Sequence, residues 1–166
     1  MTAIDDVATG QLRWNVKESF REYVRELPDG EEKWTAEVGG ITDGDLVFPA
    51  VAVSLDAETA VPPTFKFEGG VRFTGYRGML RVDIKDPWIE VGEAETSLTA
   101  DTAPPGVPPR RTVIATVPGR PAVVEGGACV WHPESTALTA AGAALLGSVY
   151  QPGTEAAGFS FEVLPA

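Results

Sequence analysis

The sequence predicts one mainly β domain, built as an antiparallel β-sandwich or an open barrel with one N-terminal helix and one short C-terminal helix. Two observations lead to this prediction. Short runs in which apolar and polar residues alternate recur along most of the chain. Between them are spread 18 glycines and 14 prolines, as frequent turns require. The 166 residues fit a single domain covering 1–166.

The N-terminal helix is predicted over residues 15–27. Apolar residues recur there at i, i+4, i+7, i+8 and i+11 and so share one helical face: Val16, Phe20, Tyr23, Val24 and Leu27. Asn15 is the predicted N-cap, with Glu18 three residues later as its reciprocal partner. The turn-forming sequence Pro28-Asp29-Gly30 ends the helix.

After Gly30 the apolar period changes to two, which is typical of strands with one buried face. Gly69-Gly70 interrupts this alternation and is either a hairpin turn or a bulge. Asp86-Pro87 separates two further pieces, and 74–78 is a tight connection. The Pro-rich stretch 101–111 is predicted to be a surface loop, and 139–146 a short helix that ends at Gly147. The predicted strands are 33–38, 46–55, 65–67, 71–73, 80–85, 88–91, 96–100, 112–117, 127–131 and 159–164.

The charge of the chain argues against two classes of partner. Its net charge is −11, and no cluster of Lys or Arg interrupts the acidic background. Nucleic acid and anionic membrane surfaces are therefore not expected as partners. No apolar run reaches the length of a transmembrane helix, and Met1 to Asp6 do not resemble a secretory leader, so a cytoplasmic location is expected. Cys129, the only cysteine, lies in an apolar run and is predicted to be a buried thiol.

Few residues lie in a catalytic motif. The 24 Asp and Glu residues are numerous enough for a glycosidase pair, but none of them lies in a recognisable motif. His132 is the only histidine, which excludes a site with several histidine ligands. A serine triad would need this histidine, and the chain has no G-x-S-x-G elbow. Phosphate-binding glycine motifs are absent as well. The sequence therefore favours a binding domain over a metabolic enzyme.

Ser19 and Tyr23 are four residues apart and therefore neighbours on one face of the predicted helix. Two interpretations are open. A hydroxyl and a phenol side by side can face a ligand pocket. Alternatively, Tyr23 is a core residue of an amphipathic helix and Ser19 is a tolerated small residue.

The segment from Trp14 to Val24 resembles the signature of the Htaa family, the haem-transport-associated domains of actinobacterial haem uptake. A second stretch, Val71–Leu80 followed by Asp86-Pro87, is similar to another family motif. A third runs from Leu138 through Tyr150 to Phe161. The three stretches occur in the family's order, so the resemblance covers nearly the whole chain.

The resemblance implies a site for haem b. In the family, the tyrosine at Tyr23 ligates the ferric iron, the serine at Ser19 helps to hold the haem, and the aromatic residue at Tyr150 lines the apolar side. A phenolate is a hard donor suited to ferric iron. The family has a histidine at the position of Tyr76, where it hydrogen-bonds the ligand oxygen. Tyr76 either takes over this contact, ligates the iron itself, or fills the haem slot.

Three functional hypotheses follow. The first and favoured one is a non-enzymatic, tyrosine-ligated haem domain that serves as an intracellular haem carrier or buffer. The second is an Htaa-fold domain that has lost haem binding and binds another ligand or a protein partner. The third is a haem-dependent enzyme, which would lack a histidine near the proposed site. An exposed sheet edge could also pair two copies, so a homo-oligomer is compatible with the sequence.

Overall fold

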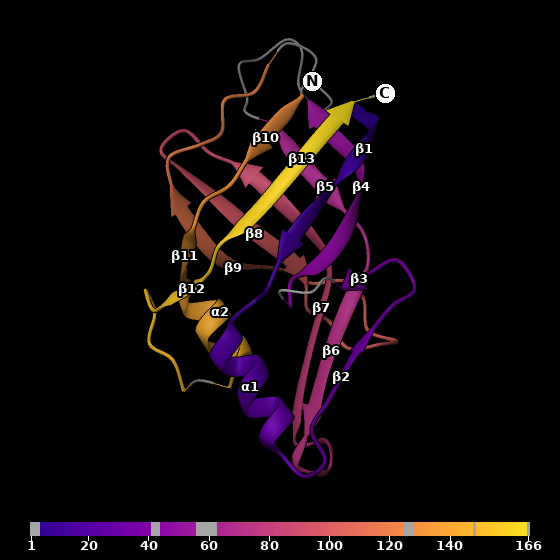
Figure 1. Cartoon of the computed structure of the whole chain (residues 1–166), viewed down its shortest axis with the longest axis vertical. Helices are drawn as coiled ribbons and strands as arrows, with labels where there is room; N and C mark the ends of the chain where they lie inside the picture. The colour runs from indigo at the N-terminus through magenta and orange to yellow at the C-terminus, as the bar shows by residue number, and fades with distance from the viewer. Residues whose placement is uncertain (1–3, 41–43, 56–62, 125–127, 148, 166) are drawn as a thin grey trace.

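Most of the chain forms one curled antiparallel sheet (Figure 1). The structure is a computed structural model that describes residues 4–40, 44–55, 63–124, 128–147 and 149–165. The sheet is a half-barrel accompanied by two helices, which confirms the predicted class and, of its two arrangements, the open barrel. In the described ranges the strand order is β10-β13-β1-β4-β5-β7-β8-β9-β11-β12, with β2 paired to β6, β6 also to β7, and β3 to β4.

The elements have the following bounds: β1 Ile4–Trp14, α1 Glu18–Glu26, β2 Glu31–Trp34, β3 Gly39–Gly40, β4 Leu46–Leu55, β5 Thr64–Phe67, β6 Gly70–Gly75, β7 Leu80–Val91, β8 Glu95–Asp101, β9 Arg111–Pro118, β10 Cys129–Trp131, β11 Ser135–Leu138, α2 Ala140–Leu145, β12 Glu155–Ala157 and β13 Phe159–Pro165. One 3-10 turn, Tyr76–Gly78, joins β6 to β7. No helix in the described part of the chain has the length and apolarity to cross a bilayer.

Most predicted strands are confirmed, and the missed ones are mostly short. The strand predicted over 46–55 coincides with β4, whereas β2 begins and ends earlier than the predicted 33–38. The sequence analysis missed β1, β3, β11 and β12. In β1 the alternation is hidden by a register shift between Val7 and Gln11 around Gly10, which has a φ of 126°. Part of the strand predicted over 127–131 lies outside the described residues.

The break at Gly69-Gly70 is a bulge and not a hairpin. Strands β5 and β6 both pair with β7, as Phe65 with Ile89 and Phe73 with Val82 show. Opposite the break, Asp86 has a φ of 50°, donates its N–H to the Gly69 carbonyl over 2.8 Å and accepts from the Gly69 N–H over 3.1 Å. β7 is therefore one strand, although the sequence predicted two pieces separated at Asp86-Pro87.

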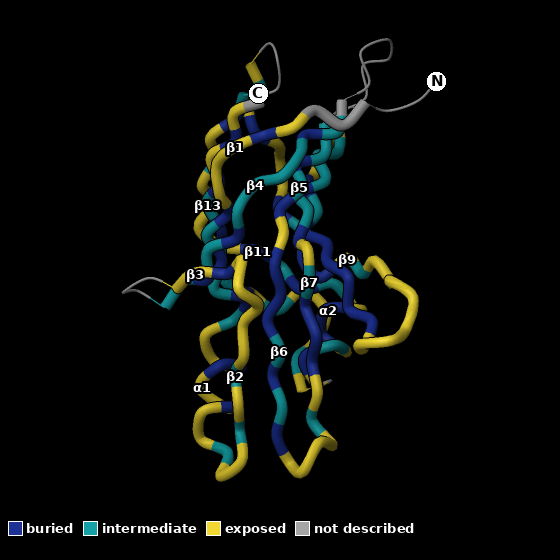
Figure 2. The backbone as a smooth tube through the Cα atoms, turned by 90° about the vertical axis from the view of Figure 1, so that its right-hand side faces the viewer, coloured by how far each residue is buried: buried dark blue, intermediate teal, exposed yellow. Residues whose placement is uncertain are grey.

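The core lies inside the curl and continues along β6 and β7 (Figure 2). Phe65 packs against Phe161 with 5.0 Å between ring centroids, and Phe20 of α1 meets Phe73 of β6 edge-on at 5.1 Å. Cys129 is buried, as predicted, and desolvation raises the pKa of its thiol to about 11. Both ends of the chain lie at one end of the molecule, and the β6–β7 turn lies at the other (Figure 1).

The short helix α2 confirms the prediction for 139–146. Thr139 is its N-cap, and the Thr139 side chain accepts a hydrogen bond of 2.9 Å from the Gly142 N–H. Gly147 follows the helix with a φ of 96°, a conformation that favours glycine. The Pro-rich stretch between β8 and β9 is irregular, as predicted.

Candidate functional site

Helix α1 begins later than predicted. Lys17 is its N-cap and makes no capping hydrogen bond through its side chain, so the predicted cap at Asn15 was wrong. The reason is the turn that leads out of β1. Val16 is buried there with a φ of 73°, and this left-handed conformation keeps residues 15–17 out of the helix.

Tyr23 does not belong to the buried face of α1. Phe20 and Val24 are buried, whereas 42% of Tyr23 is exposed. The periodicity placed Tyr23 with the core residues, but it lies at the edge of that face, where its side chain reaches solvent. Its phenol is therefore open to a ligand, and the interpretation of Tyr23 as a core residue is wrong.

A buried ion pair fixes α1 to the sheet. The Arg21 guanidinium donates two hydrogen bonds of 2.8 Å to the Glu32 carboxylate and a third to the Gly44 carbonyl. Desolvation alone would raise the pKa of Glu32, but the hydrogen bonds from Arg21 and Trp34 and the charge of Arg21 outweigh it and lower the pKa. Sequence reasoning missed Arg21, because a cation on an amphipathic helix is usually solvated.

Tyr23 and Tyr76 form a hydrogen-bonded phenol pair. The Tyr23 hydroxyl donates to the Tyr76 Oη over 2.8 Å, and the ring centroids lie 6.4 Å apart. This hydrogen bond is the main reason that the pKa of Tyr23 is raised, because it stabilises the protonated phenol. Tyr76 is itself 50% exposed. The structure thus brings together the two residues that the sequence placed at the proposed iron.

The backbone at Tyr76 is held in an unusual conformation. Tyr76 and Arg77 have φ values of 47° and 56°, both in the left-handed region. The Asp29 carboxylate accepts hydrogen bonds from both of their N–H groups, over 3.1 Å and 2.7 Å. Sequence reasoning gave Asp29 only a role in ending the helix. An Asp-Gly turn is a weak local signal, and its contact with a turn 47 residues away follows only from the fold.

Ser19 and Tyr150 form a second pair one helical turn away. Ser19 Oγ and Tyr150 Oη lie 3.1 Å apart, and either hydroxyl can be the donor. The Lys17 ammonium lies 4.8 Å from the centroid of the Tyr150 ring and donates to the Glu155 carbonyl over 2.9 Å. Sequence reasoning gave Lys17 no role, although it lies two residues before Ser19 in the segment that resembles the family signature.

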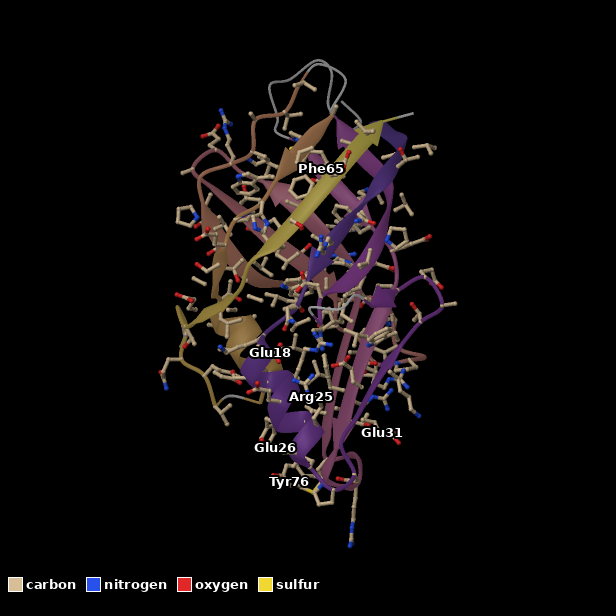
Figure 3. All side chains as sticks on the ribbon, viewed as in Figure 1. Glu18, Arg25, Glu26, Glu31, Phe65 and Tyr76 are labelled. Atoms are coloured by element: carbon tan, nitrogen blue, oxygen red, sulfur yellow. The ribbon has the colours of Figure 1, made fainter. Side chains whose placement is uncertain are left out.

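The four predicted site residues therefore form two hydrogen-bonded pairs, each with one member on α1. Tyr76 lies beyond the Glu26 end of the helix and Glu18 marks the other end (Figure 3). All three tyrosines of the chain belong to this row. We define the site row as Ser19, Tyr23, Tyr76 and Tyr150.

Three cavities lie elsewhere on the described part of the chain. A cavity of about 190 Å³ includes Trp34 and Arg72, one of about 320 Å³ includes Arg13 and His132, and one of about 180 Å³ includes Gln11. None of these three includes a residue of the site row. Among the described residues, no three His, Cys, Asp or Glu side chains gather as a metal site would require.

Comparison with protein-family models assigns the chain to a family. The model described as Htaa matches residues 9–162. The chain belongs to the Htaa family. The resemblance found in the three sequence motifs is thereby confirmed.

Solved structures of Htaa domains share the fold. The C-terminal domain of HtaA from Corynebacterium glutamicum is 25% identical, with a TM-score of 0.77 over 96% of this chain and 98% of that one. The N-terminal domain of the same protein is 20% identical, with a TM-score of 0.75 over 100% and 99%. The haem-binding protein HtaB from the same organism is 18% identical, with a TM-score of 0.68 over 99% and 96%. A search of curated proteins found no significant match.

Proposed function

We propose that this Htaa domain binds haem b and that Tyr23 is the ligand of its ferric iron. The observation that carries the proposal is the Tyr23 phenol, which is 42% exposed on α1 with its oxygen 2.8 Å from the Tyr76 oxygen. Membership of the Htaa family and the similarity to the haem-binding protein HtaB support haem as the ligand class.

The donor set of the site row fits a ferric haem. Phenolate oxygen is an established haem ligand. Haem is also a flat, largely apolar disc that needs apolar contacts beside a few polar anchors. The rings of Tyr76 and Tyr150 can supply apolar faces, and Met79, which follows the Tyr76 turn, is 90% exposed. Ser19 and Tyr150 add hydroxyl groups one turn along the helix.

The contact between the two phenols places Tyr76 where it can support a Tyr23 phenolate. Tyr23 uses its own proton in the bond, so the Tyr76 proton is uncommitted. When Tyr23 gives up its proton, Tyr76 can turn its hydroxyl and donate to the phenolate. Tyr76 thereby takes over the hydrogen bond that the family histidine makes to the ligand oxygen. We propose this role for Tyr76, rather than iron ligation or filling of the haem slot.

The proposed role is that of a carrier or buffer without catalytic activity. Bound haem would supply redox and oxygen chemistry, but the site row contains no histidine, the residue that most often serves as acid or base in turnover. The one imidazole, His132, lines a cavity that includes none of the site row. The cytoplasmic location and the homo-oligomer considered from the sequence stay predictions, which cell fractionation and light scattering would test.

A haemin titration tests the proposal against loss of haem binding. The purified chain should bind haemin at one equivalent, with a shifted Soret band and quenching of its four tryptophans. Tyr23→Ala should lose the Soret shift, and Trp34→Phe, outside the site row, should keep it. No shift with the unmodified chain would favour a domain that binds another ligand or a protein partner.

A further inference from the structure

Strands β2, β6 and β7 lie side by side, with α1 against one face (Figure 1). Phe73 of β6 points to the helix, where it meets the Phe20 ring at 5.1 Å. Its neighbour Arg72 points to the opposite face, because successive side chains of a strand alternate. Lys33 and Asp83 are the register partners of Arg72 on the two adjoining strands and share that face. These three residues line the cavity of about 190 Å³, which therefore lies on the face away from α1.

A buried carboxylate orients two arginines beside this cavity. Asp83 is 5% exposed, and its two oxygens accept hydrogen bonds from the Arg72 Nε–H over 2.8 Å and from the Arg81 Nε–H over 3.1 Å. Each guanidinium uses only this one N–H, and neither makes another hydrogen bond with the described residues. The Nη–H donors of Arg72 are therefore held in place on the wall of the cavity and left for a ligand.

Three further donor groups line the same cavity. Lys33 and Lys85 bring their ammonium groups from β2 and β7, and Thr35 brings a hydroxyl. Thr35 Oγ1 accepts a hydrogen bond of 2.9 Å from the Gly70 N–H, which leaves its own proton uncommitted. The stem of Lys85 crosses Gly70, where an added Cβ would lie 2.7 Å from the Lys85 Cγ. Glycine at position 70 thus lets Lys85 reach the other donors.

The lining side chains are positively charged in an acidic protein. Three cations and one carboxylate, Asp83, line the cavity and give it a charge of +2, whereas the whole chain carries −11. Outside the lining, Glu31 pairs with Lys33 over 3.2 Å and Asp101 with Lys85 over 3.4 Å. Each pair uses one of the three N–H donors of an ammonium, so both lysines keep donors for a ligand.

We propose that this cavity binds the phosphate group of a small molecule, either inorganic phosphate or a phosphate monoester. A phosphate group carries about −1.5 to −2 at neutral pH and has at least three acceptor oxygens, which match the lining charge and its several donors. A carboxylate has a single charge and two oxygens and would leave part of the donor set unused. The proposed site lies on the face of β6 away from α1 and does not depend on haem binding.

A titration of the haem-free chain with inorganic phosphate at constant ionic strength tests the proposal. In nitrogen–proton correlation spectra, the amide signals of 33–35, 70–72 and 83–85 and the Nε–H signal of Arg72 should shift and saturate. Acetate at equal concentration should shift them far less. Methyl phosphate distinguishes the two sources, because tighter binding than inorganic phosphate indicates a monoester and weaker binding indicates the free ion.

Variants of the lining cations identify the site. Arg72→Gln should weaken phosphate binding roughly tenfold and Lys85→Gln roughly fivefold, since each loses a charged donor. Lys85→Gln keeps both arginine bonds to Asp83, so it tests the site even if Arg72→Gln impairs folding. Arg13→Gln is the matched control and should change nothing. Arg13 is 39% exposed beside Asp45 in a different cavity, and Arg72 is 40% exposed beside Asp83.

Two results would overturn this inference. Shifts that do not saturate, or that acetate reproduces at the same concentration, would show that the cavity has no phosphate site. An unchanged phosphate affinity in Lys85→Gln would place any bound phosphate elsewhere. Failure of the proposed function looks different, because the chain would then give no Soret shift with haemin and would still respond to phosphate.

Discussion

Asp29 holds Tyr76 in a left-handed conformation, because its carboxylate oxygen accepts a hydrogen bond of 3.1 Å from the Tyr76 backbone N–H at a φ of 47°. A side chain other than glycine pays roughly 1–3 kcal/mol for such a backbone conformation. The contact with Asp29 offsets part of that cost. It also ties the turn after α1 to the turn between β6 and β7, and so keeps the Tyr76 phenol within reach of Tyr23.

Removal of the Asp29 carboxylate should therefore release the Tyr76 phenol. In Asp29→Ala we expect the pKa of Tyr23 to fall toward its ordinary value, because the hydrogen bond to Tyr76 weakens. The free energy of unfolding should fall by about 1–3 kcal/mol, since two backbone N–H groups lose their acceptor. Absorbance titration of the phenols and urea denaturation measure the two effects. Glu93→Ala, which removes an exposed carboxylate on another loop, should change neither.

The variant Tyr76→Phe removes the hydroxyl and keeps the aromatic ring, so it tests the role of the hydroxyl alone. The pKa of Tyr23 should again fall toward its ordinary value, because the oxygen that accepts its proton is gone. Haem affinity should fall by roughly tenfold, since the ligand oxygen loses its hydrogen-bond donor. The chain has only three tyrosines, so a phenol titration of the haem-free protein can follow each of them. An unchanged Tyr23 titration would contradict the proposed pairing in solution.

Haem binding should release one proton. The raised pKa keeps Tyr23 protonated at neutral pH, and iron binds the phenolate. Affinity should accordingly rise about tenfold per pH unit on the acid side of the Tyr23 pKa. Calorimetry in two buffers of different ionisation enthalpy counts the proton directly. Tyr76→Phe should still release it, because an ordinary phenol is also protonated at pH 7. A binding enthalpy independent of the buffer would argue against tyrosine ligation.

The ion pair between Arg21 and Glu32 should govern the stability of α1. Arg21→Met leaves a largely buried carboxylate without its partner and should cost about 3 kcal/mol. The pKa of Glu32 is lowered in the folded state, so its contribution is present above the unfolded pKa and is lost as the pH falls through the folded value. Urea denaturation between pH 3 and 6 should show this loss below the ordinary glutamate value of 4.5, and Glu32→Gln should show less of it.

The sequence predicted those parts of the fold that depend on local patterns. The strand 46–55 and the helix after Thr139 follow from apolar period, capping and turn residues. β1 was missed because polar residues and a bulge at Gly10 obscure its alternation. The start of α1 was misplaced because a buried Val16 adopts a left-handed conformation that β-branched residues rarely take.

The resemblance to the family predicted each residue of the site row, but not which of them contact one another. Tyr76 accepts a hydrogen bond from Tyr23, which is 53 residues away in the sequence. Tyr150 and Ser19, which share the other hydrogen bond, are 131 residues apart. Asp29 was assigned only to the turn after the helix, and Lys17, although it lies within the segment that resembles the family signature, was assigned no role. Asp29 supports a strained turn on a distant hairpin, and Lys17 is defined by the ring that it covers. Such roles emerge from packing between elements, which periodicity does not encode.

In the proposed haem complex the Tyr23 oxygen is the donor to ferric iron. Resonance Raman spectra of the ferric haem complex, excited in the phenolate-to-iron charge-transfer band, test it directly. The unmodified chain and Tyr76→Phe should both show phenolate vibrations, and Tyr23→Phe should show none. Phenolate vibrations that persist in Tyr23→Phe, or vanish in Tyr76→Phe alone, would assign the iron to a different oxygen and contradict this account.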